Sequence, residues 1–188
     1  MRDWDSVYQQ AEIKPGSSCE VLNSNLHLLP NSGTALDYAC GAGVNSIWLA
    51  QQGLQVTAVD ASAVVVGKLN QYATKQQLPL HAIQQDLEVQ PLLPDQYDLV
   101  LVSHFLYRPA LELLPTMLKP GGLLFYQTYS GEQVHGQGPA NPDYRFKVNE
   151  LLQVYNSMHI LFYREDWGIG NAPEGLHGQA LMVAVKPG

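Results

Sequence analysis

Short apolar segments without polar alternation recur between residues 34 and 128, separated by stretches in which apolar residues have a helical spacing. Such apolar runs are typical of strands covered on both faces, and their alternation with helices predicts a mostly parallel sheet with helices on either side. We predict core strands at Thr34–Ala39, Gln55–Asp60, Leu80–Gln84, Tyr97–Ser103 and Gly122–Thr128. The helices between them are predicted at about Asn45–Gln52, Ser62–Gln76 and Pro109–Leu118.

The two ends of the chain depart from this alternation. Short helices predicted at Arg2–Gln10 and Cys19–Leu28 make residues 1–30 a helical cover. After the last core strand, we predict a helix at Phe146–Tyr155, extended runs at Met158–Tyr163 and Gln179–Val185, and a loop at Trp167–Gly178 between them. The closing strand pair predicts a reversed edge strand. The expected fold is therefore a single-domain, Rossmann-like, doubly wound α/β fold with a mostly parallel seven-stranded sheet.

Residues 130–145 form a long segment rich in Gly and Pro, with no periodicity over Ser130–Asp143. Loops of this length in compact domains are often lids or binding loops. We predict that this segment is a substrate lid that becomes ordered on binding.

Composition and charge exclude several classes of function. The 188 residues, 46% of them hydrophobic, suit one soluble domain spanning 1–188, and no apolar run is long enough to cross a membrane. Because the first twenty residues lack a signal-peptide core, we expect a cytoplasmic protein without a membrane partner. A net charge of −7 and scattered Lys and Arg argue against a nucleic-acid surface. The two distant Cys are expected to be reduced, and no paired His or Cys spacing predicts a metal site.

The most informative motif is a strand ending in an acid, a glycine turn, and a second strand ending in an acid. It consists of Leu36-Asp37-Tyr38-Ala39-Cys40-Gly41-Ala42-Gly43, followed by Val56-Thr57-Ala58-Val59-Asp60. A turn around Gly41 lets the backbone approach a nucleoside-bearing cofactor, the next helix offers free N–H groups, and Asp60 is placed to accept both ribose hydroxyls. Alternatively, Asp60 caps the following helix together with Ser62.

Two classes of cofactor fit this motif. The nicotinamide fingerprint has a Gly or Ala where this chain has Ser46. The acid Asp37 before the turn suits the ammonium group of S-adenosylmethionine, which carries no phosphate. The motif therefore favours S-adenosylmethionine over a nicotinamide cofactor.

Further motifs accompany the glycine turn. They are Trp4-Asp5-x-x-Tyr8, Gln85-Asp86-Leu87, Leu118-Lys119-Pro120-Gly121-Gly122, and Gly138-Pro139-Ala140-Asn141-Pro142-Asp143-Tyr144 with Asn149-Glu150-Leu151-Leu152. With these motifs the chain resembles the class I S-adenosylmethionine-dependent methyltransferases, especially the small bacterial tellurite-resistance and thiopurine-methyltransferase-like group. The resemblance covers nearly the whole chain.

The resemblance implies a cofactor site. Its expected residues are Trp4, Tyr8, Asp37, Ala39, Cys40, Gly41, Asn45, Asp60, Ala61, Asp86, Leu87, Ser103 and His104. Asp37 and the backbone of residues 39–41 would hold the methionine end, and Asp60 the ribose. Asp86 and the Leu87 N–H would meet the adenine, with residues 103 and 104 as the floor. Two alternatives stay open: Asp86 as a turn acid, and Trp4 with Tyr8 as a core-packed helix face.

The chain departs from the group's pattern at Ala39, Val44, His104 and Gln127. The last three lie near the methyl-transfer end. They therefore bear on the identity of the substrate rather than on that of the cofactor.

The implied activity is methyl transfer by in-line displacement to a small-molecule acceptor: a thiol, a metalloid or a small metabolite. Acceptor-side candidates are His104, Tyr107, Arg108 and Tyr129, followed by Tyr144, Arg145 and Lys147. His104 is the candidate base because its ordinary pKa lies near physiological pH, and its alternative is a structural histidine. Arg108 is either an anion clamp or simply the start of a helix.

Two other functions remain open. One is a catalytically silent S-adenosylmethionine-binding sensor or partner protein. The other is a nicotinamide-dependent oxidoreductase, although Tyr144 and Lys147 are three residues apart rather than the four of a Tyr-x-x-x-Lys pair. The expected protein is a monomer or homodimer that binds no nucleic acid.

Overall fold

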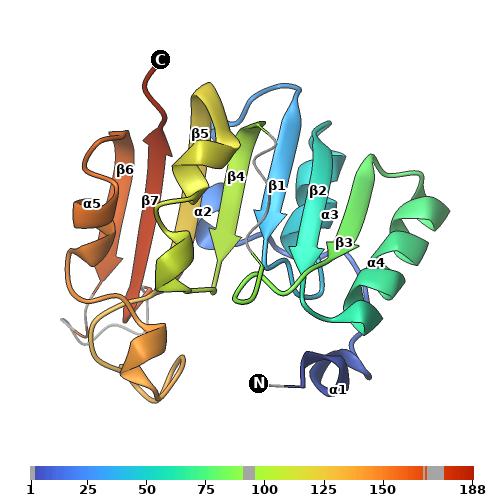
Figure 1. Cartoon of the computed structure of the whole chain (residues 1–188), viewed down its shortest axis with the longest axis horizontal. Helices are drawn as coiled ribbons and strands as arrows, with labels where there is room; N and C mark the ends of the chain where they lie inside the picture. The colour runs from blue at the N-terminus through green and yellow to red at the C-terminus, as the bar shows by residue number, and fades with distance from the viewer. Residues whose placement is uncertain (1–2, 91–95, 167, 169–175) are drawn as a thin grey trace.

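The computed structural model describes residues 3–90, 96–166, 168 and 176–188, which are built around one seven-stranded sheet (Figure 1). The strand order is β3-β2-β1-β4-β5-β7-β6. The strands are β1 (Thr34–Tyr38), β2 (Gln55–Asp60), β3 (Leu80–Gln84), β4 (Tyr97–Ser103), β5 (Leu118–Tyr129), β6 (His159–Asp166) and β7 (Gln179–Val185). Strands β1 to β5 pair in parallel, and β7 runs antiparallel to both β5 and β6. The predicted mostly parallel sheet with one reversed strand is confirmed, and the reversed strand lies between β5 and the edge strand β6.

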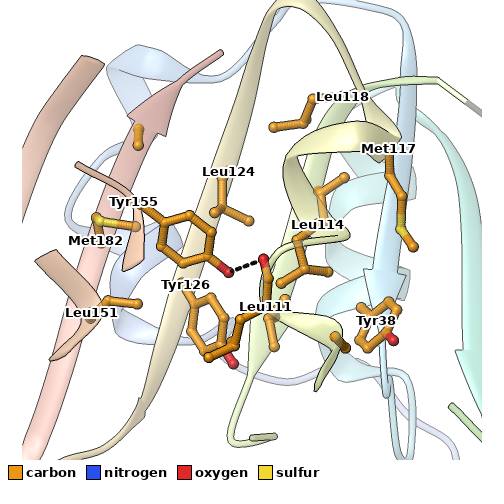
Figure 2. Close-up of a cluster of buried hydrophobic side chains, with 14 of the residues drawn as sticks. Tyr38, Leu111, Leu114, Met117, Leu118, Leu124, Tyr126, Leu151, Tyr155 and Met182 are labelled. Atoms are coloured by element: carbon orange, nitrogen blue, oxygen red, sulfur yellow. Dashed lines mark hydrogen bonds between the residues drawn. The ribbon is translucent and has the colours of Figure 1, made fainter. Parts of the chain in front are cut away.

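Both faces of the sheet are covered, as predicted. Successive side chains of a strand point to opposite faces. In β4, Val100 and Val102 therefore enter one apolar cluster, while Leu99 and Leu101 enter the other. The first cluster includes side chains of α5 (Glu150–Val154) and of the 3-10 helices η2 (Arg108–Ala110) and η3 (Leu114–Met117). The second includes side chains of α2 (Glu20–Asn23), α3 (Val44–Gln51) and α4 (Ala63–Gln76). Figure 2 shows the first cluster, where the buried Tyr155 hydroxyl donates to the Leu111 carbonyl at 3.1 Å.

The helix predicted at Pro109–Leu118 is wrong. The segment instead forms η2 and η3, each with a proline in its first turn. Pro115 would lie inside the predicted helix, where it lacks the backbone N–H and its ring clashes with the preceding turn. Strand β5 begins at Leu118, four residues earlier than predicted, and passes through Gly121 at φ 77° beside a register shift against β4.

The helix predicted at Cys19–Leu28 is interrupted, giving α2 and the 3-10 helix η1 (Leu26–Leu28). Between them lies the buried Asn25, whose side-chain amide donates to the Val21 carbonyl at 3.0 Å. Asparagine side chains that bond to nearby backbone in this way compete with the helical pattern.

The last predicted elements are shifted along the chain. Helix α5 begins at Glu150 rather than at Phe146, because Phe146 is buried in a bridge with Ser130 and Asn149 takes φ 60°. Strand β6 continues past Tyr163 to Asp166. Most of the loop predicted at Trp167–Gly178 lies outside the described residues, as does Arg2 at the start of the first predicted helix.

Helix α1 (Trp4–Tyr8) lies at the end of the sheet to which the parallel strands point (Figure 1). No helix in the described part of the chain has both the length and the hydropathy of a membrane-spanning segment.

Candidate active site

A cavity of about 750 Å³ lies at the carboxyl ends of the parallel strands. Ligands of open α/β sheets bind at this edge, and a volume of this size suits a cofactor together with a small substrate. The cavity is lined by α1, by residues at or just after the carboxyl ends of β1 to β5, and by the 130–145 segment. The expected site residues that line it are Trp4, Tyr8, Ala39, Asp60, Ala61, Asp86, Leu87, His104, Tyr129 and Tyr144.

Asp60, at the end of β2, organises the glycine turn. Its carboxylate accepts the Gly41 N–H on one oxygen and the Ser62 N–H on the other, both at 2.9 Å. Both Ala39 (φ 61°) and Gly41 (φ 53°) take left-handed backbone conformations, so the chain turns sharply beneath the cavity. The cap of α4 is the Ser62 hydroxyl, which accepts the Val65 N–H, rather than Asp60 itself. Asp60 is only 7% exposed, and this burial raises its pKa.

Asp37 and Asn45 lie below the turn and do not line the cavity. Asp37 is buried and accepts a 2.5 Å hydrogen bond from the Ser46 hydroxyl. Burial raises the pKa of Asp37 to about 6, although the Ser46 bond opposes this. The Asn45 side-chain oxygen accepts the Cys19 N–H at 2.9 Å, which holds the start of α2. Asp37 therefore bonds to the first turn of α3 from the protein interior, and the half-buried Asn45 connects α3 to the start of α2.

The two cysteines are in the reduced form, as expected. Burial raises the pKa of Cys19 to about 12 and also raises that of Cys40. Both are therefore neutral thiols at physiological pH.

Helix α1 is held at the cavity by polar contacts. The Asp5 carboxylate accepts the Ser62 hydroxyl at 2.6 Å and the Val64 N–H at 3.2 Å, at the start of α4. Also from α4, the Lys68 ammonium donates to the carbonyls of residues 8, 9 and 11 at 3.1, 2.7 and 3.0 Å. No α1 residue is buried.

These contacts place two aromatic rings at the cavity. The rings of Trp4 and Tyr8 stack with centroids 6.3 Å apart, and both line the cavity. The Tyr8 hydroxyl lies 2.9 Å from the position that a Cβ on Gly41 would take. A side chain at position 41 would therefore collide with this cover.

His104 follows β4 and faces the cavity with its backbone at φ 54°. Its backbone N–H donates to the Gln127 carbonyl at 2.8 Å, and its Nδ1 lies 3.0 Å from the Ser103 hydroxyl. The ring is 5.3 Å, centroid to centroid, from that of Tyr129. His104 is exposed to solvent on its cavity side, and partial desolvation of the imidazole lowers its pKa, while a hydrogen bond with Gln179 acts in the opposite direction. His104 is therefore neutral at physiological pH and able to accept a proton.

The structure does not bring Arg108 or Tyr107 to the cavity. Arg108 Nε and Nη2 donate to the Glu150 carboxylate at 2.9 and 3.0 Å. The same guanidinium also donates to the carbonyls of Asp143 and Arg145, at 2.6 and 2.8 Å. These bonds tie the 130–145 segment to α5 and leave Arg108 badly placed for an anion clamp. Tyr107 is half-buried against the first apolar cluster.

The unusual Gln127 has a structural explanation. Its side-chain oxygen accepts the Val21 N–H at 2.9 Å, and its amide donates to the Gln179 side chain at 2.8 Å, all within the protein interior. Gln127 thus attaches α2 to the sheet. Val44 packs against the loop at Gly16, with its Cγ1 3.1 Å from the position of a Cβ there.

Sequence reasoning missed several cavity residues: Gln85, Glu88, Phe105, Leu106 and Thr128. All of them adjoin predicted site residues in the chain. Their common signal is position, because each lies at or just beyond the carboxyl end of a predicted strand. Gly138, Pro139 and Tyr144 of the predicted lid also line the cavity.

Comparison with known proteins agrees with this architecture. Residues 35–122 match the family described as a methyltransferase domain. The fold is that of the class I methyltransferases. The crystal structure of TehB from Haemophilus influenzae superposes with a TM-score of 0.72 and 21% identity, covering 97% of this chain and 67% of that one.

Two curated relatives extend the comparison. Malonyl-[acyl-carrier protein] O-methyltransferase of Enterobacter lignolyticus is 34% identical over 132 residues, which is 68% of this chain and 51% of the relative. Hemagglutinin 1 of Eikenella corrodens is 30% identical over 168 residues, which is 81% of this chain and 54% of the relative. The chain thus spans about half the length of these two relatives.

Proposed function

We propose that this chain is a single-domain, S-adenosylmethionine-dependent methyltransferase that acts on a small-molecule acceptor by in-line displacement. The observation that carries the proposal is one cavity that joins Asp60 and Asp86 to His104 and Tyr129 beside the glycine turn. The methyltransferase family match supports S-adenosylmethionine as the cofactor, as does a structural neighbour bound to S-adenosylhomocysteine.

The residues present fit this cofactor. Each carboxylate oxygen of Asp60 accepts one backbone N–H and has a second lone pair, which suits the two ribose hydroxyls. Asp86 accepts the Glu88 N–H on one oxygen at 3.0 Å, which fixes its carboxylate beside Leu87 at the cavity wall. Trp4 and Tyr8 cover the site. When bound, S-adenosylmethionine supplies a methyl group on a sulfonium, a good leaving group.

The acceptor end is the part of the cavity formed by His104, Phe105, Tyr129 and Tyr144. These side chains would place the nucleophilic atom in line, and positioning of this kind supplies about 7–11 kcal/mol of the barrier reduction. The neutral His104 would accept the proton of a thiol or hydroxyl acceptor. We also propose that the chain belongs to the tellurite-resistance and thiopurine-methyltransferase-like group, on the basis of the Trp4 and Asn141–Tyr144 motifs. The proposed location is cytoplasmic, and the proposed state is a monomer or homodimer.

The decisive experiment is calorimetric titration of the purified protein with S-adenosylhomocysteine, with NADH as the control. We expect micromolar affinity for S-adenosylhomocysteine alone. An acceptor screen with thiophenol, catechol, selenite and tellurite would follow, with S-adenosylhomocysteine formation as the readout.

Each other outcome identifies a different function. Binding of NADH in preference to S-adenosylhomocysteine would indicate the oxidoreductase. Binding of S-adenosylhomocysteine without turnover on any acceptor class would indicate the silent cofactor-binding protein.

A further inference from the structure

Arg145 is a buried cation at the base of the 130–145 segment. The residue is 4% exposed, and its guanidinium bonds to backbone carbonyls rather than to carboxylates. These carbonyls belong to residues 130, 131, 132, 137 and 178, at 3.0, 2.9, 2.6, 3.3 and 3.4 Å. Among the described residues, no carboxylate forms an ion pair with it. A buried charge without such bonds would be costly, so these carbonyls are held around the guanidinium.

The same guanidinium lies over the ring of Tyr129. Its central carbon is 5.5 Å from the ring centroid, within the range of a cation–π contact. Gly138 also packs against this ring, since a Cβ built there would come 2.4 Å from a ring carbon. Tyr129 is therefore fixed by Arg145 and by a turn that Arg145 organises through the residue 137 carbonyl.

Tyr129 in turn contacts the candidate base. Its ring lies beside His104, with centroids 5.3 Å apart, and both side chains line the cavity. The Ser103 hydroxyl and Gln179 face the same imidazole from β4 and β7. Arg145 itself does not line the cavity. Arg145 therefore contacts Tyr129, which lines the acceptor end of the cavity, but does not itself line the cavity.

We propose that Arg145 is a positioning residue for the acceptor end of the cavity: it fixes the Tyr129 ring and, through that ring, His104. This inference rests on the proposed methyltransferase function for its catalytic consequence. The geometry on which it depends is independent of that function.

The first experiment replaces Arg145 with Lys and with Gln, and uses Arg164→Gln as the matched control. Arg164 is also a guanidinium with a local partner, Asp166 on β6, but it contacts neither His104 nor Tyr129. Lysine keeps the charge but loses the planar fork that serves several carbonyls at once. The His104 pKa is measured in each variant by NMR titration. We expect R145K and R145Q to raise it toward the ordinary histidine value, and R164Q to leave it unchanged.

The kinetic readout separates positioning from general damage. For R145K we expect kcat/KM for the acceptor to fall by about tenfold to a hundredfold, as a small misplacement of reacting groups can cause. The dissociation constant for S-adenosylhomocysteine should stay within about twofold, because Asp60 and α1 are not touched. If R145K weakens S-adenosylhomocysteine binding as much as it lowers kcat/KM for the acceptor, the proposal is contradicted.

A second experiment moves Tyr129 without altering Arg145. Gly138→Ala places a methyl group into the Tyr129 ring at φ 78°, whereas Gly136→Ala imposes a similar backbone strain at φ 71° with no atom within 4 Å. We expect G138A to reproduce the His104 shift of R145K and G136A not to do so. This pair remains informative if R145Q fails to fold.

A double-mutant cycle gives the final test. If Arg145 acts through Tyr129, the effect of R145K on the His104 pKa should vanish in a Tyr129→Leu background. Additive effects would overturn the proposal. The NMR measurement of the His104 pKa needs neither cofactor nor acceptor. Failure of the protein to bind S-adenosylhomocysteine would therefore reject the proposed function alone. An unchanged His104 pKa in R145K would reject this inference alone.

Discussion

Replacing Asp60 with Asn is the sharpest test of the cofactor end, because this carboxylate has two tasks. It holds the glycine turn through the N–H groups of Gly41 and Ser62, both at 2.9 Å, and it is placed to accept ribose hydroxyls. Asparagine has nearly the same shape but only one oxygen, and its NH₂ group cannot accept a hydrogen bond. The substitution therefore removes the charge and half of the acceptors.

The magnitude follows from these bonds. A hydrogen bond to a charged group contributes about 1.5–3 kcal/mol, so losing one ribose bond should weaken S-adenosylhomocysteine about 10- to 150-fold. Burial raises the pKa of Asp60, so the charged form is already disfavoured in the native protein. Removing that charge offsets part of the lost backbone bond, and the free energy of unfolding should change by only about 1 kcal/mol.

Calorimetric titration with S-adenosylhomocysteine and thermal unfolding, both near neutral pH, measure the two effects separately. The matched control is Asp98→Asn, since Asp98 also holds backbone, accepting the Thr34 N–H at 2.8 Å, but at the opposite end of the strands. We expect D98N to lose stability and to keep cofactor affinity. A folded D60N protein that binds S-adenosylhomocysteine as tightly as the wild type would refute the assignment of Asp60 to the ribose.

Three other predictions follow from described contacts. Because burial raises the pKa of Asp37 to about 6, the native state holds this proton more tightly than the unfolded chain, and stability falls as the pH rises from about 4 to 6. Asp37→Asn should therefore gain about 2–3 kcal/mol over the wild type between about pH 4 and pH 7 in urea unfolding, and parallel profiles would contradict this. Lys68→Met removes three bonds to the last residue of α1 and the turn after it, and should weaken S-adenosylhomocysteine about three- to tenfold with little change in unfolding, whereas Lys75→Met should leave binding unchanged. In the cluster of Figure 2, Tyr155→Phe loses a buried hydrogen bond and about 1 kcal/mol of stability, while Tyr38→Phe, whose hydroxyl has no partner in the described part of the chain, should be neutral or stabilising in the same unfolding assay.

The predicted elements that match the structure share one property. Strands β2, β3, β4 and β7 begin and end at the predicted residues. Each is a compact run with apolar residues at its centre, so the local chain signals agree with burial, which is extensive in β2, β4 and β7 and partial in the edge strand β3. The capping of α4 by Ser62 was likewise predictable from the sequence, because its hydroxyl accepts the N–H of Val65, three residues further along the chain.

Where the structure gives a predicted site residue an unexpected partner, the cause is a contact between distant residues. Arg108 was a candidate anion clamp, but its guanidinium bonds to the carboxylate of Glu150, which lies 42 residues away in the chain. Asn45 was expected at the cofactor, but Cys19, 26 residues earlier, takes its side-chain oxygen. Spacing along the chain contains no information about such partners, so the sequence predicted which strand ends carry polar residues but not which distant groups those residues contact.

The attachment of α1 has a consequence for how the cavity exchanges its contents. The helix buries none of its residues, and its polar ties to α4 include those of Asp5 and Lys68. Its release would expose mainly the half-buried rings of Trp4 and Tyr8, so we expect a smaller heat-capacity change and a smaller dependence on denaturant than for unfolding of the core. Salt, which screens the charged ties, acts on it more strongly. We therefore expect substitutions at Asp5 or Lys68 to loosen the cover of the cavity with little effect on the packing of the sheet.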